Sequence, residues 1–312
     1  MADAPLRIAV LDDYQDVARR FAEWPDGTVF FHEPLADPAE AVQDFDVVVA
    51  MRERTAFPAA LLERLPRLRL LVTTGMRNAS IDLDAARAGG ITVCGTEALG
   101  HPTAELAWGL ILAVARRIPQ EDAALRAGRW QTTVGLGLRG LTLGVLGLGR
   151  LGSHVAAFGN AFGMRVTAWS QNLTAERAAE GGAALVERDA LFREADVLTI
   201  HLVLSERTRG LVGARELSLM KPTALLVNTS RGPIVDEAAL AAALRDGTIA
   251  GAAVDVYDRE PVPPDHPLLD APNTVLTPHL GYVTEENYAV FYGQAVEDIA
   301  AYAAGAPVRV LA

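Results

Sequence analysis

The chain alternates short strand-like runs with Ala-rich helical stretches, and this alternation constrains its fold more than any other feature. Each run of β-branched or leucine residues is followed by turn residues and then by apolar residues at helical spacing. The strand candidates of the first third are 7–11, 29–31, 47–50, 70–73 and 91–94. A better marked series follows at 143–146, 166–169, 197–200, 225–228, 252–256 and 274–277. The pattern predicts an α/β fold with two parallel sheets.

Two predicted helices organise the chain around these sheets. The segment 100–105 carries Pro102 and leads into an apolar run at 106–115, which is typical of a helix with proline in its first turn. This helix would join two domains, the number that a length of 312 residues favours. Apolar residues at helical spacing predict a last helix over 285–303.

Composition excludes several classes of partner. Lys and Arg number 28 against 39 Asp and Glu, and the net charge of -11 would repel nucleic acid and anionic lipid surfaces. The longest apolar run, 106–115, has about half the length of a bilayer span. Cys94 is the single cysteine, and Asp12 and Asp13 follow the first apolar run directly. We therefore expect no disulfide, no signal peptide, no membrane contact and a cytoplasmic location.

A glycine-rich loop follows the strand candidate 143–146 and precedes a predicted helix. Gly147, Gly149 and Gly152 form a GxGxxG pattern, which gains its meaning from this strand-turn-helix context. The first glycine permits the tight turn, the second lets the backbone approach a pyrophosphate, and the third allows close packing of helix on strand. The loop predicts a dinucleotide cofactor.

The residues after the next strand leave the choice between NAD and NADP open. An acidic residue about 20 positions after the motif would bind the ribose hydroxyls of NAD, but Ser170, Gln171 and Asn172 occupy this region and the first carboxylate is Glu176. Ser170 could meet a hydroxyl or a phosphate. Arg177 could pair with a 2′-phosphate or be a solvated helix residue, so the sequence favours NADP only slightly.

Three polar residues follow strands of the second series, where open α/β folds collect ligands: Arg231, Glu260 and His279. A 2-hydroxy acid loses its hydroxyl proton as hydride leaves the same carbon, and histidine suits this exchange. Glu260 would favour the imidazolium form of His279, and the planar guanidinium of Arg231 could hold a substrate carboxylate. Taken singly, Arg231 could also be a surface ion-pair partner, Glu260 a loop charge, and His279 a cap of the next helix.

No spacing of Cys, His and Asp residues is typical of a metal site, so we expect no metal. His101, His154 and His201 are interpreted as helix-end, helix-face and strand-end residues.

Four motifs in this order resemble the NAD(P)-dependent D-isomer-specific 2-hydroxyacid dehydrogenases, a family that includes glyoxylate/hydroxypyruvate reductases and phosphoglycerate dehydrogenases. They are GLGRLG at 147–152, NTSRGPIVDEAAL at 228–240, AAVDVYDREP at 252–261 and LTPHLG at 276–281. The resemblance covers nearly the whole chain. It implies catalytic roles for Arg231, Glu260 and His279, with His279 as the general acid/base.

The resemblance also implies further cofactor contacts and a domain organisation. Arg150 and Leu151 would contact the pyrophosphate, Asp255 the nicotinamide carboxamide, and Thr229 the cofactor side of the cleft. Two Rossmann-like domains are implied, with a cofactor domain at 100–284 inserted into a discontinuous substrate domain made of 1–99 and 285–312.

The family places a substrate-binding glycine turn after a strand of the first domain, and the matching segment is 73–78. Gly75, Met76 and Arg77 would lie there, and Arg77 could contact the substrate or face solvent. Arg52, which also follows a strand, is a weaker candidate. Members usually form homodimers, and the run 106–115 could supply the interface or belong to the core.

These observations predict an oxidoreductase that interconverts a D-2-hydroxy acid and its 2-keto acid, with glyoxylate or hydroxypyruvate as the first substrate candidates. Two alternatives remain. A formate-dehydrogenase-like enzyme of the same fold would need no glutamate beside its histidine. A dinucleotide-sensing binding protein would keep the fold without turnover.

Overall fold

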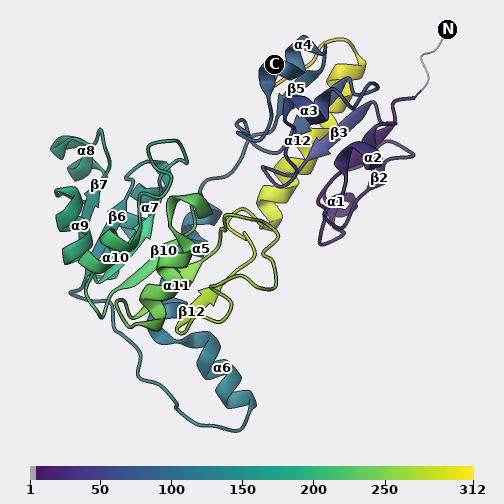
Figure 1. Ribbon diagram of the computed structural model, residues 1–312. Coiled ribbons are helices and arrows are strands. Elements are labelled where there is room, and N and C mark those ends of the chain that lie inside the picture. Colours follow the sequence, from purple (N-terminus) through teal and green to yellow (C-terminus); the bar gives the residue numbers. More distant parts are fainter. Residues whose placement is uncertain (1–4) are drawn as a thin grey trace. The chain divides into compact units, whose positions relative to one another are not determined.

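The computed structural model describes residues 5–312, and the chain divides into two compact units. Unit 1 comprises the residues up to Leu99 together with Val283–Ala312, and unit 2 comprises Gly100–Tyr282. Unit 2 is thus an insertion into the chain of unit 1 (Figure 1).

Unit 1 is built on a five-stranded parallel sheet of order β2-β1-β3-β4-β5, the order of the flavodoxin-like doubly wound fold. Its strands are β1 (Ile8–Val10), β2 (Val29–Phe30), β3 (Val47–Ala50), β4 (Leu70–Thr73) and β5 (Thr92–Gly95). Its helices are α1 (Ala18–Phe21), α2 (Pro38–Val42), α3 (Ala59–Leu62), α4 (Leu83–Ala88) and α12 (Glu285–Ala303).

The last helix completes unit 1, as its amphipathic pattern requires. One core cluster packs α2, α3 and α4 against the sheet, while α12 contacts β4 and α1 instead. Tyr288 and Tyr292 of α12 are buried and pack their rings against Phe21 of α1. Helices therefore cover both faces of this sheet.

Unit 2 carries a seven-stranded parallel sheet of order β12-β11-β10-β9-β6-β7-β8, the dinucleotide-binding order with one added strand. Its strands are β6 (Thr142–Leu146), β7 (Arg165–Trp169), β8 (Ala184–Leu185), β9 (Val197–Ile200), β10 (Leu225–Asn228), β11 (Gly251–Val254) and β12 (Thr274–Leu276). Its helices are α5 (His101–Arg116), α6 (Ile118–Arg126), α7 (Arg150–Ala161), α8 (Ala175–Glu180), α9 (Arg188–Glu194), α10 (Ala214–Leu219) and α11 (Glu237–Arg245).

Alternate residues of these strands pack on opposite faces of the sheet. Leu143 and Val145 lie in a cluster with α5 and α7, whereas Leu146 lies in a second cluster with α9, α10 and α11. The predicted fold class, with two Rossmann-like units and parallel sheets, is confirmed.

The apolar run 106–115 belongs mainly to the core of unit 2. Ala107, Ile111 and Val114 are buried in the cluster that α5 forms with α7 and the sheet. Of the two alternatives left open by the sequence, core and free interface, the structure supports core. The short strand β8 was not predicted, because its two residues are both exposed and give no apolar run.

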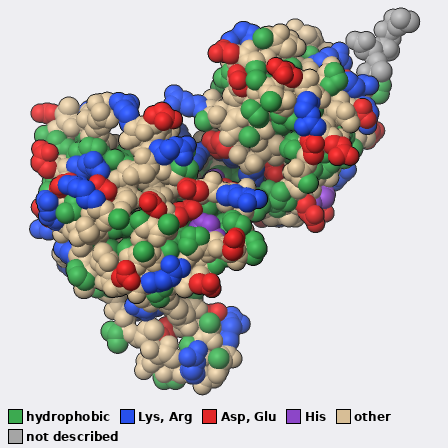
Figure 2. Space-filling view, in the orientation of Figure 1, with side chains coloured by type: hydrophobic (Ala, Val, Ile, Leu, Met, Phe, Trp, Pro, Cys, Tyr) green, Lys and Arg blue, Asp and Glu red, His purple; other side chains and the backbone are tan. Residues whose placement is uncertain are grey.

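Two further features concern membrane-spanning potential and surface charge. Among residues 5–312, no helix combines the length and the hydropathy needed to cross a bilayer. Figure 2 shows acidic and basic side chains interspersed over the visible face.

Candidate active site

The predicted site residues of unit 2 gather at one edge of its sheet. Because all strands are parallel, their carboxyl ends meet at this edge. The glycine loop follows β6, Thr229 and Arg231 follow β10, Asp255 and Glu260 follow β11, and His279 follows β12. Open α/β folds bind ligands at this edge.

His279 and Glu260 form an imidazole–carboxylate pair there. His279 Nδ1 lies 2.6 Å from Glu260 Oε2, and the two side chains are 16% and 25% exposed. The second oxygen of Glu260 accepts the Tyr257 N–H at 2.9 Å. The carboxylate thus fixes one ring nitrogen of His279 and leaves Nε2 as the nitrogen for a reacting group.

The backbone of His279 is held in the left-handed region, with φ of +54°. Asp255 enforces this turn: its carboxylate accepts the Thr277 hydroxyl at 2.6 Å and the N–H groups of Leu280 and Gly281 at 2.7 and 2.9 Å. Asp255 is fully buried, and this burial raises the pKa of its carboxyl against the lowering effect of these hydrogen bonds. The observed role of Asp255 is to shape the turn that carries His279.

Arg231 lies on a turn that a buried asparagine organises. Asn228, at the end of β10, accepts the Ser230 N–H at 3.0 Å and donates to the Arg231 carbonyl at 3.1 Å. The Arg231 guanidinium is half-buried and donates to the Ser230 carbonyl at 2.7 Å. Sequence analysis assigned no role to Asn228, although its place at a strand end, three residues before Arg231, was a usable signal.

The glycine loop and its surroundings fit a dinucleotide. Gly147 has φ of +103°, and a Cβ on Gly152 would lie 2.1 Å from the Gly147 carbonyl oxygen, so both positions require glycine. A Cβ on Gly149 would meet open space. Helix α7 starts at Arg150 without a side-chain cap, which leaves the amides of its first turn, including those of Arg150 and Leu151, open to a phosphate.

A second observation supports the same fit. The Thr229 hydroxyl oxygen is buried and has no hydrogen-bond partner among residues 5–312. Buried polar groups rarely go unpaired, so this position suits a ligand contact. The residues present therefore fit a dinucleotide cofactor.

The residues that would select between NAD and NADP lie after β7. Ser170 is half-buried, Gln171 and Asn172 are exposed, and Arg177 is exposed in the first turn of α8. Thr174 caps this helix by accepting the Arg177 N–H at 3.3 Å.

The substrate candidates of unit 1 gather at the carboxyl ends of β3 and β4. Arg52 has φ of +53°, and its guanidinium donates to the Thr74 carbonyl at 3.1 Å. The guanidinium lies across Gly75, where a Cβ would come within 1.9 Å of Arg52 Nη1. Met76 and Arg77 follow on the same turn and are exposed. The structure therefore brings Arg52 and Gly75 together.

Two details of this turn were not foreseen. The Gly75 N–H donates to the Thr96 hydroxyl at 2.9 Å, so this amide is engaged within unit 1. Asn78 links the two strand ends, since its amide donates to the Arg52 carbonyl at 2.6 Å and to the Thr73 hydroxyl at 2.9 Å.

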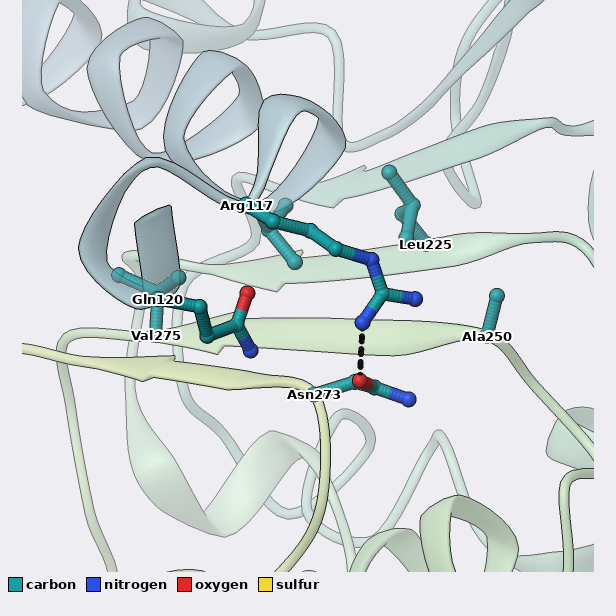
Figure 3. Close-up of a pocket in the computed structure, with 7 residues that line it drawn as sticks. Arg117, Gln120, Leu225, Ala250, Asn273 and Val275 are labelled. Atoms are coloured by element: carbon teal, nitrogen blue, oxygen red, sulfur yellow. Dashed lines mark hydrogen bonds between the residues drawn. The ribbon is translucent and has the colours of Figure 1, made fainter. Parts of the chain in front are cut away.

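Other polar groups serve the fold. At the amino ends of β10 to β12, Figure 3 shows the Arg117 guanidinium hydrogen-bonded to the Asn273 side chain beside a small cavity of about 20 Å³. In unit 1 the carboxylate of Asp13 approaches Asp16 and His32 closely enough to suggest a metal site. Asp13 instead accepts the N–H groups of Val17 and Ala18 at the start of α1, so we assign no metal to this group.

Comparison with known proteins decides the family. Residues 108–281 match the family described as D-isomer specific 2-hydroxyacid dehydrogenase, NAD binding domain. The chain is also 45% identical to a glyoxylate reductase of Aeropyrum pernix over 255 residues, which are 78% of this chain and 76% of that protein. The chain belongs to this family of dehydrogenases. The predicted family and enzyme class are confirmed.

Solved structures of dehydrogenases share the whole architecture. A phosphoglycerate oxidoreductase from Vibrio cholerae O395 superposes with a TM-score of 0.92 at 37% identity, over 97% of this chain and 100% of that one. A D-lactate dehydrogenase from Aquifex aeolicus, complexed with NAD and lactic acid, gives a TM-score of 0.77 at 25% identity, over 96% of each chain. The family match and this complex support a nicotinamide dinucleotide cofactor.

Proposed function

We propose that this dehydrogenase interconverts a D-2-hydroxy acid and its 2-keto acid, with Arg231, Glu260 and His279 as its catalytic residues. The observation that carries the proposal is the 2.6 Å contact of His279 with Glu260, at the sheet edge that also bears Arg231 and the glycine loop. A formate-dehydrogenase-like reaction would need no such carboxylate beside the histidine.

The bound dinucleotide supplies or accepts the hydride, and the residues of the chain handle charge and protons. In the reduction of a 2-keto acid, His279 donates the proton from Nε2 to the carbonyl oxygen as hydride reaches the carbonyl carbon. Glu260 stabilises the protonated imidazolium and holds its Nδ1. Arg231 binds the substrate carboxylate and polarises the carbonyl. In the oxidation His279 takes the hydroxyl proton instead.

The cofactor is held by three groups of residues. Gly147, Gly149 and Gly152, with the α7 amides of Arg150 and Leu151, would hold the pyrophosphate. Thr229 and Asp255 would lie toward the nicotinamide.

We infer a slight preference for NADP at the adenosine end. Ser170 stands where an NAD-binding carboxylate is usual, and the exposed Arg177 is the nearest cation in the sequence that could pair with a 2′-phosphate. The ratio of kcat/KM for NADPH to that for NADH measures this preference. Arg177→Ala should lower the ratio several-fold, and an unchanged ratio would remove Arg177 from the cofactor site.

The proposed substrates are glyoxylate and hydroxypyruvate. Relatives named glyoxylate reductase and phosphoglycerate oxidoreductase both resemble this chain, and both names describe acids with a 2-hydroxy or 2-keto group. Arg52, Met76 and Arg77 of unit 1 would bind the substrate carboxylate and side chain, and Gly75, whose amide is held by Thr96, would give the turn its shape.

Turnover followed at 340 nm tests the proposal. NADH and NADPH are offered separately with glyoxylate, hydroxypyruvate, pyruvate and longer 2-keto acids, to the wild type and to His279→Ala. We expect oxidation of the reduced cofactor by at least one acid and its loss in the variant. Tight cofactor binding with no turnover on any acid would favour the dinucleotide-sensing alternative.

We further propose that the chain forms a homodimer through α6 and the segment that follows it. Figure 1 shows this part projecting from the sheet of unit 2. Ile118, Leu125, Trp130 and Val134 lie on it with 52%, 58%, 77% and 95% exposure, and a second copy would cover them. Light scattering should give the mass of a dimer for the wild type and of a monomer for a Trp130→Ser, Val134→Ser variant. A monomeric wild type would overturn this proposal.

A further inference from the structure

A second imidazole–carboxylate pair lies beside the first in unit 2. His266 Nε2 is 2.8 Å from Glu237 Oε2, and the two side chains are only 6% and 12% exposed. The Leu268 N–H donates to His266 Nδ1 at 3.3 Å, so Nδ1 is an acceptor and the proton sits on Nε2, which donates to Glu237. His266 thus links the Leu268 amide to the Glu237 carboxyl group.

The two pairs hold successive amides of one loop. Glu237 Oε1 accepts the Asp258 N–H at 2.9 Å, and Glu260 Oε1 accepts the Tyr257 N–H at 2.9 Å. Each carboxylate thus connects one imidazole to the loop that follows β11. A displacement of this loop at Asp258 moves Tyr257, and with it the amide that orients Glu260.

Other contacts also limit the freedom of the loop. The Tyr257 hydroxyl donates to the carbonyls of Val254 and Thr277 at 3.2 and 3.1 Å, and the Tyr257 ring meets the His266 ring edge-on at 5.5 Å. His266 therefore acts on the loop in two ways: indirectly, through its hydrogen bond to Glu237, and directly, through its contact with the Tyr257 ring.

The local structure stabilises the Glu237–His266 pair without any role in the proton transfer. Glu237 lies in the first turn of α11, where the helix dipole favours a negative charge, and the hydrogen bond from His266 satisfies its second oxygen. An ionised acceptor also binds the Asp258 amide more strongly than a neutral one would.

We propose that His266 and Glu237 are positioning residues for the reaction: they hold the Asp258 N–H and, through the Tyr257–Asp258 peptide, the adjoining Tyr257 N–H that orients Glu260 toward His279. The inference rests on the proposed function, since Glu260 and His279 act there as the proton-handling pair. Loss of the second pair should lower kcat while leaving cofactor binding nearly unchanged, because no atom of His266 or Glu237 belongs to the proposed cofactor site.

Three variants of the full chain test this. His266→Leu removes the donor to Glu237 and should lower kcat for 2-keto acid reduction about tenfold or more, with the Kd for NADH within twofold of the wild type. His266→Gln keeps an N–H that can reach Glu237 and should recover kcat to within about threefold. Glu237→Gln cannot accept hydrogen bonds from both His266 and the Asp258 amide as well as a carboxylate does, so its kcat should lie between those of the two His266 variants. It replaces His266→Leu in the test if that variant does not fold.

Lys221→Gln is the matched control. It breaks the 2.6 Å ion pair of Lys221 with Asp196. These two residues precede the neighbouring strands β10 and β9, so the pair lies at the amino ends of the strands, opposite the edge that carries the loop. This change should lower the melting temperature but leave kcat as it is.

The outcomes separate the two proposals. If the wild type reduces a 2-keto acid but His266→Leu keeps kcat within twofold, or if His266→Gln loses as much as His266→Leu, the positioning role is wrong and the catalytic assignment stands. If the wild type turns over no 2-keto acid, the proposed function fails, and the positioning role fails with it.

Discussion

Replacing Gly232 by alanine should disable the site although the change adds a single methyl group. Gly232 follows Arg231 and packs directly against the loop that carries Glu260. A Cβ at this position would lie 2.0 Å from the Tyr257 carbonyl carbon and 2.3 Å from the Asp258 nitrogen. Carbon atoms in contact are about 3.5–4.0 Å apart, so the peptide would have to move by about 1.5 Å.

The size of the effect follows from what this movement breaks. This peptide is held by the bond from its Asp258 N–H to Glu237, and the peptide before it by the bond from the Tyr257 N–H to Glu260. Overpacking costs about 1–3 kcal/mol, and the loss of one charge-assisted hydrogen bond adds about 1.5 kcal/mol, so we expect the free energy of unfolding to fall by roughly 2.5–4.5 kcal/mol. A misplacement of about 1 Å can also lower the rate about 100-fold.

Gly109→Ala is the matched control within the same unit. Gly109 is exposed in α5, and a Cβ there would meet no atom within 4 Å. It should stabilise the protein by about 0.5–1 kcal/mol through the helix propensity of alanine. Urea unfolding and cofactor oxidation at 340 nm are measured for both variants. If the free energy of unfolding of Gly232→Ala stays within about 0.5 kcal/mol of the wild type and its rate of cofactor oxidation within about threefold, the packing argument is refuted, because surface substitutions without such contacts have effects of this size.

Three further predictions concern single residues. Glu260→Gln should lower kcat for reduction about 10- to 100-fold in stopped-flow assays, since a hydrogen bond to a charged group contributes about 1.5–3 kcal/mol; an unchanged kcat would remove Glu260 from the reaction. Burial lowers the pKa of His201 to about 4, so between pH 4 and 6.5 the unfolded state binds more protons and stability falls as the pH falls; His201→Gln should flatten this loss in urea unfolding at pH 4.5 and 7, and an equal loss in both proteins would contradict the assignment. Arg117→Ala should lower the free energy of unfolding by about 1 kcal/mol without changing kcat/KM, and a changed kcat/KM would show that the Arg117–Asn273 contact reaches the site.

The architecture was predictable because hydrophobic runs and glycine turns encode it locally. The terminal helix predicted over 285–303 is α12, and the strand preceding the glycine loop ends at Leu146 as expected. Two exposed residues such as Ala184 and Leu185 carry no such signal, so β8 went unforeseen. The local hydrophobic pattern therefore determined which helices and strands could be predicted.

The site was predictable only in part, because side-chain partners depend on loop paths. The order of motifs indicated Arg231, Glu260 and His279, and the strand ends bring all three to one edge. Asn228 acts locally, on a carbonyl three residues along the chain, whereas the role of Asp255 in the His279 turn comes from a hydrogen bond that spans 25 residues. The use of the Gly75 amide by Thr96 is of the same kind, since 21 residues separate the two.

A single-turnover experiment tests the central claim most directly. Reduced cofactor is bound to the wild type and to His279→Ala, its Kd is measured by fluorescence, and its oxidation is followed after mixing with glyoxylate or hydroxypyruvate. The account predicts Kd values within about twofold and a rate at least about 100-fold lower in the variant, the scale of general acid catalysis. An equal rate in both proteins would contradict the assignment of His279 as the proton donor.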